Sequence, residues 1–181
     1  MRKKYDVNSK VHFLEVFPFI IILVIYWPLI VLMLSAQVIV YYILKNYYLE
    51  KRKWDLNFSC GNTDGGGINA DILKRYVTNF VLIKDIYNLP FKDKQFTYTL
   101  CSHTIEHVDY PERFYKELKR ISKNIVLVVP PIWDLSALLN MKEHKWHFLT
   151  FKTMHMNNIP KGIKLTPWWW LRERMGWYAG P

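Results

Sequence analysis

The stretch SHTIEHV, residues 102–108, holds three side chains whose types and spacing could carry out chemistry. His103, Glu106 and His107 form the pattern H-x-x-E-H, which one group of zinc hydrolases uses. In such an enzyme the pattern lies within a helix, so that both histidines share one face. The same residues could instead form a turn at a ligand site, directly after a buried strand.

The neighbours of this motif favour the turn. The motif follows a predicted strand, and Asp109-Tyr110-Pro111 interrupts it, because proline disfavours helix in the residue before it. A zinc hydrolase would also need a downstream carboxylate ligand, and beyond the helix pattern of residues 110–123 only three acidic residues remain: Asp134, Glu143 and Glu173. No second helix is predicted to hold one. We therefore expect no metal site, with the rings of His103 and His107 separated by a strand-to-helix turn and lacking a common focus.

The surrounding sequence alternates strand and helix patterns. Phe114, Leu118 and Ile121 stand at i, i+4 and i+7 within residues 110–123, as in an amphipathic helix. Short apolar runs that end in turns predict strands at 54–60, 68–72, 80–86, 95–102 and 124–131. Strands that are nearly all apolar on either side of a helix indicate a parallel sheet covered on both faces. The fold class is therefore predicted as α/β.

Residues suited to a nucleoside ligand stand at the predicted strand ends. These are Cys60-Gly61-Asn62, Asp71, Asp85 and Ser102-His103. Ligands of open parallel sheets bind beyond the carboxyl ends of the strands. A glycine loop lets the backbone approach a ligand closely, while one carboxylate can accept ribose hydroxyls and another can face the amino group of a base.

Two segments carry a resemblance to a known family: CGNTDGGGINADI and DIYNLPFKDKQFTYTLCSHTIEHVDYPERFYKELKRISKNIVLVVP. They resemble class I S-adenosylmethionine-dependent methyltransferases of the short methyltransferase-domain type, over about residues 54–131. The resemblance implies a Rossmann-like, parallel-rich sheet with helices on both faces, truncated at the C-terminus, and S-adenosylmethionine as cofactor. It also implies the cofactor-binding residues Cys60, Gly61, Asn62, Asp71, Asp85, Ile86, Ser102 and His103.

Within that resemblance each part of the cofactor has an expected partner. The glycine loop would hold the methionine part, and Asp71 would bind the ribose. Asp85 would face the adenine amine with Ile86 beside the ring, while Ser102 and His103 would form the floor of the site.

Two functional hypotheses follow. The first is a membrane-anchored methyltransferase acting on a lipid-like or membrane-presented acceptor, with His107 and His147 as candidate bases because histidine titrates near neutral pH. The second is a catalytically degenerate relative that serves as a structural or assembly subunit of a membrane complex. Intact Asp71 and Asp85 favour the first; Asn57, where the family usually has an acid, favours the second.

An apolar segment without any charge, Val16 to Leu44, precedes this core. As a helix, its 29 residues would span about 43 Å, more than the ~30 Å hydrocarbon core of a bilayer. Four basic residues flank each side, so the positive-inside rule gives no orientation, and Pro28 would kink or break a helix. We expect a single transmembrane helix rather than a re-entrant hairpin, and the lipid bilayer as a partner.

Charge distribution and cysteine content indicate which other partners can be expected. Of the formal net charge of +10, half comes from residues 1–53, next to the apolar segment, where it suits anionic headgroups. The remaining residues lack a basic stripe interleaved with aromatics, so we expect no nucleic-acid partner. Cys60 and Cys101 show no disulfide framework, which favours reduced thiols and a soluble domain on the cytosolic side.

The segments expected are a basic flank (1–15), a transmembrane or re-entrant segment (16–44), a basic linker (45–53), the Rossmann-like core (54–131) and a lid with a tryptophan-rich end (132–181). His144, His147 and His155 could be metal ligands, but no acid or cysteine cluster joins them, so we interpret them as part of a lid. The tryptophan-rich end either lies at a membrane interface or packs against the sheet: Trp168, Trp169, Trp170 and Trp177, with Arg172 and Arg174.

Overall fold

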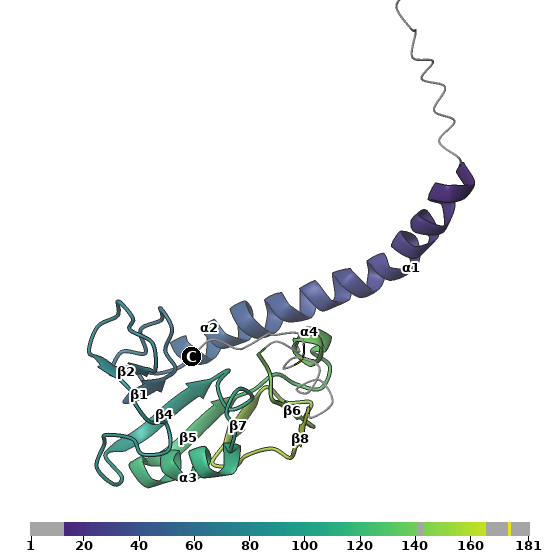
Figure 1. Cartoon of the computed structure of the whole chain (residues 1–181). Coiled ribbons are helices and arrows are strands. Elements are labelled where there is room, and N and C mark those ends of the chain that lie inside the picture. Colours follow the sequence, from purple (N-terminus) through teal and green to yellow (C-terminus); the bar gives the residue numbers. More distant parts are fainter. Residues whose placement is uncertain (1–12, 141–142, 166–173, 175–181) are drawn as a thin grey trace, which may run out of the picture.

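Five parallel strands and one antiparallel strand form the central sheet of the computed structural model, which describes residues 13–140, 143–165 and 174 (Figure 1). The strand order is β3-β2-β1-β4-β5-β7, and β7 is the antiparallel member. The bounds are β1 (Leu56–Phe58), β2 (Ile68–Asp71), β3 (Phe80–Leu82), β4 (Phe96–Ser102), β5 (Ser122–Val128) and β7 (Met154–Met156). A separate two-stranded sheet pairs β6 (Trp146–Phe148) with β8 (Gly162–Lys164). The predicted α/β, Rossmann-like class is confirmed.

Helices cover both faces of the sheet, as predicted. On one face lies α3 (Pro111–Ile121), whose Phe114, Leu118 and Ile121 are fully buried, and the ring of Phe114 lies 5.3 Å from that of Phe58 on β1. On the other face Leu49 of α2 (Lys45–Glu50) packs in one cluster with outward-facing apolar residues of β4 and β5. The short α4 (Leu135–Leu139) follows β5.

The connection from β1 to β2, residues 59–67, contains no helix although the two strands are parallel. Such connections usually need a dozen or more residues. Here amide side chains brace the loop, since Asn57 donates to the carbonyl oxygen of Thr63 (2.9 Å) and to Asn69 Oδ1 (3.2 Å). Only glycine fits at position 67, because a Cβ there would lie 2.3 Å from the carbonyl oxygen of Trp54. Close approach of the backbones therefore replaces a crossover helix.

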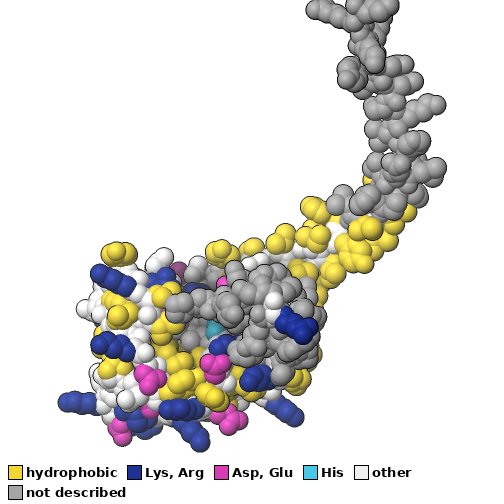
Figure 2. Space-filling model, viewed as in Figure 1, with side chains coloured by type: hydrophobic (Ala, Val, Ile, Leu, Met, Phe, Trp, Pro, Cys, Tyr) yellow, Lys and Arg dark blue, Asp and Glu magenta, His cyan; other side chains and the backbone are white. Residues whose placement is uncertain are grey.

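A continuous helix precedes the sheet and passes through Pro28 without reversing. It consists of α1 (Phe13–Gln37), a π-helical segment η1 (Val38–Leu44) and α2. Of the two geometries considered for the apolar segment, the hairpin is therefore wrong. From residue 20 to residue 35 nearly every described side chain is exposed, and these apolar side chains project away from the domain (Figures 1 and 2). Burial begins at Ala36.

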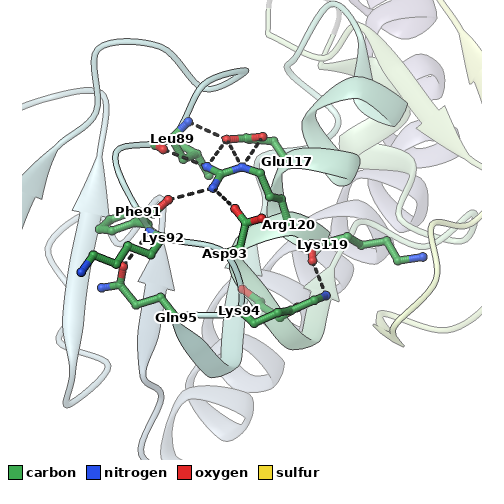
Figure 3. A network of polar contacts seen from close by, with 10 residues as sticks. Leu89, Phe91, Lys92, Asp93, Lys94, Gln95, Glu117, Lys119 and Arg120 are labelled. Carbon is green, nitrogen blue, oxygen red and sulfur yellow. Dashed lines mark hydrogen bonds and ion pairs between the residues drawn. The ribbon is translucent and has the colours of Figure 1, made fainter.

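Arg120, in the last turn of α3, links the long loop between β3 and β4 to the helix through hydrogen bonds (Figure 3). Its guanidinium donates to the carbonyl oxygens of Leu89 (3.0 Å) and Phe91 (2.8 Å), and to the carboxylates of Asp93 (2.7 Å) and Glu117 (2.6 Å). Glu117 also accepts from the Leu89 backbone (2.8 Å). The hydrogen bonds from Arg120 lower the pKa of Glu117.

We expect Arg120→Lys to lower the free energy of unfolding by about 1–3 kcal/mol, because an ammonium cannot replace the planar fork and leaves carbonyl oxygens without donors. The depressed pKa of Glu117 stabilises the fold fully above its unfolded value of about 4.3. This contribution is lost as the pH falls through the folded value. Urea titrations between neutral and acidic pH measure both effects. Arg113→Lys, on the same helix, is the control and should change little.

Candidate cofactor and acceptor site

The predicted cofactor-binding residues lie at the carboxyl ends of neighbouring parallel strands. Phe58, the last residue of β1, pairs with Ala70 of β2 on one side and Cys101 of β4 on the other. The residues that follow these strands therefore meet at one edge of the sheet: Cys60-Gly61-Asn62 after β1, Asp71 at the end of β2, and Ser102-His103 at the end of β4.

Asp71 is held by three donors of its own chain. Its Oδ2 accepts from the backbone of Gly61 (3.0 Å) and from Arg75 Nε (3.2 Å), and its Oδ1 accepts from the backbone of Leu73 (3.1 Å). Gly61 has a left-handed φ of 56°, and no heavy atom lies within 4 Å of the place a Cβ would occupy. The loop therefore leaves open space beside a carboxylate that retains about one of its four acceptor positions.

The two remaining predicted positions follow β3 and lie farther from this turn along the sheet edge. Asp85 is exposed, and its Oδ1 accepts from the backbone of Tyr87 (2.8 Å). Ile86 is half-buried and packs against the main hydrophobic core. Asn62 is exposed on the loop after β1.

A cavity of about 500 Å³ lies over the ends of β1 and β4. Of the predicted cofactor-binding residues, Ser102 and His103 line it, and His107 of the predicted bases does so too. His147 does not line it; it is buried on β6, where burial lowers its pKa. The other wall is formed by the N-terminal helix, through Met33, Gln37, Tyr41 and Lys45.

The position of this helix at the site was not predicted from the sequence. A signal was present, because Gln37, Tyr41 and Lys45 follow one another at intervals of four and place polar groups on one helix face. The ring of Tyr41 stacks on that of His103, with 4.2 Å between ring centroids. Tyr41 belongs to the π-helical segment, and π-helical turns often occur at functional sites.

The H-x-x-E-H motif forms a turn outside any helix, as predicted, and α3 begins only at Pro111. The expectation that its histidines lack a common focus is wrong. Oε1 of Glu106 lies 3.4 Å from Nδ1 of His103 and 4.0 Å from Nε2 of His107. Both rings face Glu106 because this carboxylate is fully buried beneath the turn. Burial raises the pKa of Glu106, but the neighbouring histidines lower it more, so the net direction is downward.

The comparisons with known proteins agree with this arrangement. Residues 65–128 match the sequence model of a family described as "Methyltransferase domain". This part of the chain is therefore similar in sequence to methyltransferase domains. The match supports a class I enzyme with S-adenosylmethionine as cofactor.

Individual relatives cover only part of the chain. An uncharacterised protein of Methanocaldococcus jannaschii is 33% identical over 103 residues, which cover 48% of this chain and 45% of that protein. The chain thus spans a little under half the length of this curated relative. A solved structure of a Pyrococcus horikoshii OT3 protein has 22% identity over 58% of each chain and a TM-score of 0.42. A methyltransferase from Aquifex aeolicus has 14% identity, 51% coverage of this chain, 66% of its own, and a TM-score of 0.38.

The two cysteines, Cys60 and Cys101, next to the candidate site should be unreactive in the folded protein. Burial raises the pKa of Cys60 to about 11, with a further increase from the Asp71 carboxylate, and burial raises that of Cys101 to about 12. Because only the thiolate is nucleophilic, alkylation by iodoacetamide at pH 7.5 should be at least about 100-fold slower than for a peptide thiol of pKa ~8.5. Mass spectrometry of native and urea-unfolded protein measures the ratio. Rapid native labelling of Cys60 would show that its surroundings are open to solvent.

Proposed function

We propose that this chain is a membrane-anchored S-adenosylmethionine-dependent methyltransferase that acts on a lipid-like or membrane-presented acceptor. The observation that carries the proposal is the continuous helix. Its apolar part projects from the domain, and its last turns form one wall of the cavity at the sheet edge. An acceptor held in the bilayer would therefore be close to the site.

The length of the projecting part supports an anchor. Helix α1 begins at Phe13, and Ala36 is the first buried residue among the described side chains; the helix from residue 13 to residue 35, at about 1.5 Å per residue, spans roughly 35 Å, close to the ~30 Å hydrocarbon core. Residues 36–50 then pack on the domain, which accounts for the excess length of the charge-free run. We propose that the methyltransferase domain lies on the cytosolic side.

The residues at the sheet edge fit the cofactor in type. Gly61 offers close backbone approach, Asp71 an acceptor for ribose hydroxyls and Asp85 an acceptor for the adenine amine. S-adenosylmethionine, when bound, supplies the electrophilic methyl group. On the acceptor side, His107 lines the cavity and is the candidate base, whereas His147 lies outside it.

A second candidate, a catalytically degenerate subunit of a membrane complex, has two observations in its favour. Asp71 already accepts three hydrogen bonds from its own chain, and Asn57 replaces the acid usual in the family. The Asn57 amide donates to Thr63 and Asn69, which a carboxylate could not do, so this substitution also has a structural reason.

Calorimetry on the full-length protein with S-adenosylmethionine separates the two candidates. For the enzyme we expect binding that Asp71→Ala weakens at least about tenfold, because hydrogen bonds to a charged group are worth about 1.5–3 kcal/mol each. Asp85→Asn should cost less, since the amide keeps an acceptor. Asp55→Asn, at the opposite end of β1, is the matched control and should bind like wild type. A folded wild-type protein without binding at millimolar cofactor would leave the subunit as the surviving candidate.

The anchor is tested by alkaline carbonate extraction of membranes from expressing cells. Wild-type protein should stay with the membrane fraction. The pair Ile25→Lys and Leu29→Lys should release much of it, because each lysine near the bilayer centre costs about 2.5–3.5 kcal/mol. Tyr76→Lys, an equally apolar-to-charged change at an exposed position of the domain, should not. Release of the wild-type chain would refute insertion, and cleavage of the domain by protease outside intact cells would refute the cytosolic orientation.

A further inference from the structure

Glu106 is a fully buried carboxylate with no hydrogen-bond donor on either oxygen. Such a group is costly, because an unpaired carboxylate removed from water loses its hydration without replacement. Buried charges in proteins are paired with an opposite charge or coordinate a metal ion. Glu106 therefore requires a neighbouring group or ion that supplies positive charge.

Two histidines lie beside this carboxylate, and Nε2 of His107 is 4.0 Å from Glu106 Oε1. Nδ1 of His107 is hydrogen-bonded to the carbonyl oxygen of Glu143 (3.0 Å), and Nδ1 of His144 to that of Ala137 (2.8 Å). A neutral ring that donates from Nδ1 to a carbonyl carries no proton on Nε2, which leaves that nitrogen as an electron-pair donor. Histidine ligands of metals are oriented in the same way by a backbone carbonyl or a carboxylate.

The three donor groups also converge in space. One ligand atom each from Glu106, His107 and His144 lies within 4.8 Å of the others. Ligand atoms about 2.1 Å from a tetrahedral ion are about 3.4 Å apart, so closure requires shifts of about 1 Å. The ring centroids of His107 and His144 are already 4.8 Å apart.

We propose that Glu106, His107 and His144 bind one divalent transition-metal ion, with Zn²⁺ as the ion whose ligand preferences they match best. Two imidazoles and one carboxylate, with one coordination position left open, form a recurrent zinc ligand set. This proposal departs from the sequence-based expectation of no metal site, in which His144 was considered without Glu106.

His103 offers the competing explanation. Its Nδ1 lies 3.4 Å from Glu106 Oε1, and a protonated His103 could neutralise the carboxylate without any ion. That pairing does not account for the backbone hydrogen bonds that hold Nδ1 of His107 and Nδ1 of His144 and leave the Nε2 of each neutral ring available as a ligand. An ion accounts for all three groups at once.

The proposed metal site also limits the class of compounds that could accept the methyl group. This inference rests on the proposed function. His107 and His144 line the same cavity as Ser102 and the helix residue Tyr41, so an acceptor in that cavity would lie next to the ion. A hydroxyl oxygen of an acceptor bound there would have its pKa lowered by the ion. We therefore assign the acceptor to compounds with an oxygen donor, and His107 becomes a ligand rather than a base.

Zinc binding is measured on the full-length, detergent-solubilised protein after chelation and dialysis. We expect wild type to bind about one Zn²⁺ per chain by calorimetry and elemental analysis. Loss of an orienting group usually costs about 10–100-fold in metal affinity, so loss of a ligand in Glu106→Gln or His144→Ala should cost at least about 100-fold. His155→Gln, a buried histidine on β7 outside the cluster, is the matched control and should bind like wild type.

X-ray absorption at the zinc edge tests the ligand set without any substitution. Two imidazoles and further oxygen or nitrogen ligands at about 2.0–2.2 Å are expected. A folded wild type that takes up no zinc, sulfur ligands in the spectrum, or stoichiometric binding retained by both Glu106→Gln and His144→Ala would each overturn the proposal.

Binding of S-adenosylmethionine is interpreted separately from binding of zinc. Zinc binding together with no binding of S-adenosylmethionine would keep the metal site and reject the proposed methyltransferase activity. Tighter zinc binding in the presence of catechol, a diol with two oxygen donors, would support the oxygen-donor acceptor; unchanged affinity would reject that assignment.

Discussion

Parallel pairing of β1 with both of its neighbours is the constraint on which the site depends. Three residues of β1 hold β2 on one side and β4 on the other, in registers that bring Ala70, Phe58 and Cys101 level. All segments that leave these strands then start from the same edge. Because β1 is so short, the loop after it must return at once, and the Asn57–Asn69 amides with the close approach at Gly67 make that return possible.

The N-terminal helix combines two environments along one axis. Its first part is apolar on every described side, whereas its last part is divided between Leu49, which packs on the sheet, and Tyr41 and Lys45, which face the cavity. The change begins in the last turn of α1, at Ala36 and Gln37, directly before the π-helical segment. The same helix therefore supplies both the apolar projection and a wall of the site.

The sequence was sufficient to predict those features of the fold that depend on local residue patterns. The apolar strands, the helix with Phe114, Leu118 and Ile121, and the order of strand ends follow from periodicity and from the rules of parallel sheets. Other features depend on contacts between distant residues. Arg120 binds carbonyl oxygens that precede it by about 30 residues, and no local pattern encodes such a contact.

The same limit applies at the site. Glu106 and His144 stand far apart in the sequence, and only the fold brings the segment after β5 back over the turn that follows β4, where the backbones of Lys145 and Trp146 donate to the Glu106 carbonyl oxygen. His107 could be identified as a candidate from the motif, but the residues from distant segments that lie beside it in the fold could not. The His147 prediction rested on residue type alone, and that side chain points into a different part of the fold.

If the continuous helix is anchored in a bilayer as proposed, it would connect the bilayer to the cavity as a lever. Transmembrane helices adjust their tilt to the thickness of the surrounding hydrocarbon layer, commonly by about 10–20°. Over an arm of about 30 Å, a rotation of about 10° displaces the far end by about 5 Å. Tyr41, stacked on His103 at the inner end of this arm, would transmit such a rotation to the cavity. In the proposed anchored state, bilayer thickness would thus be a physical variable that acts on the shape of the site.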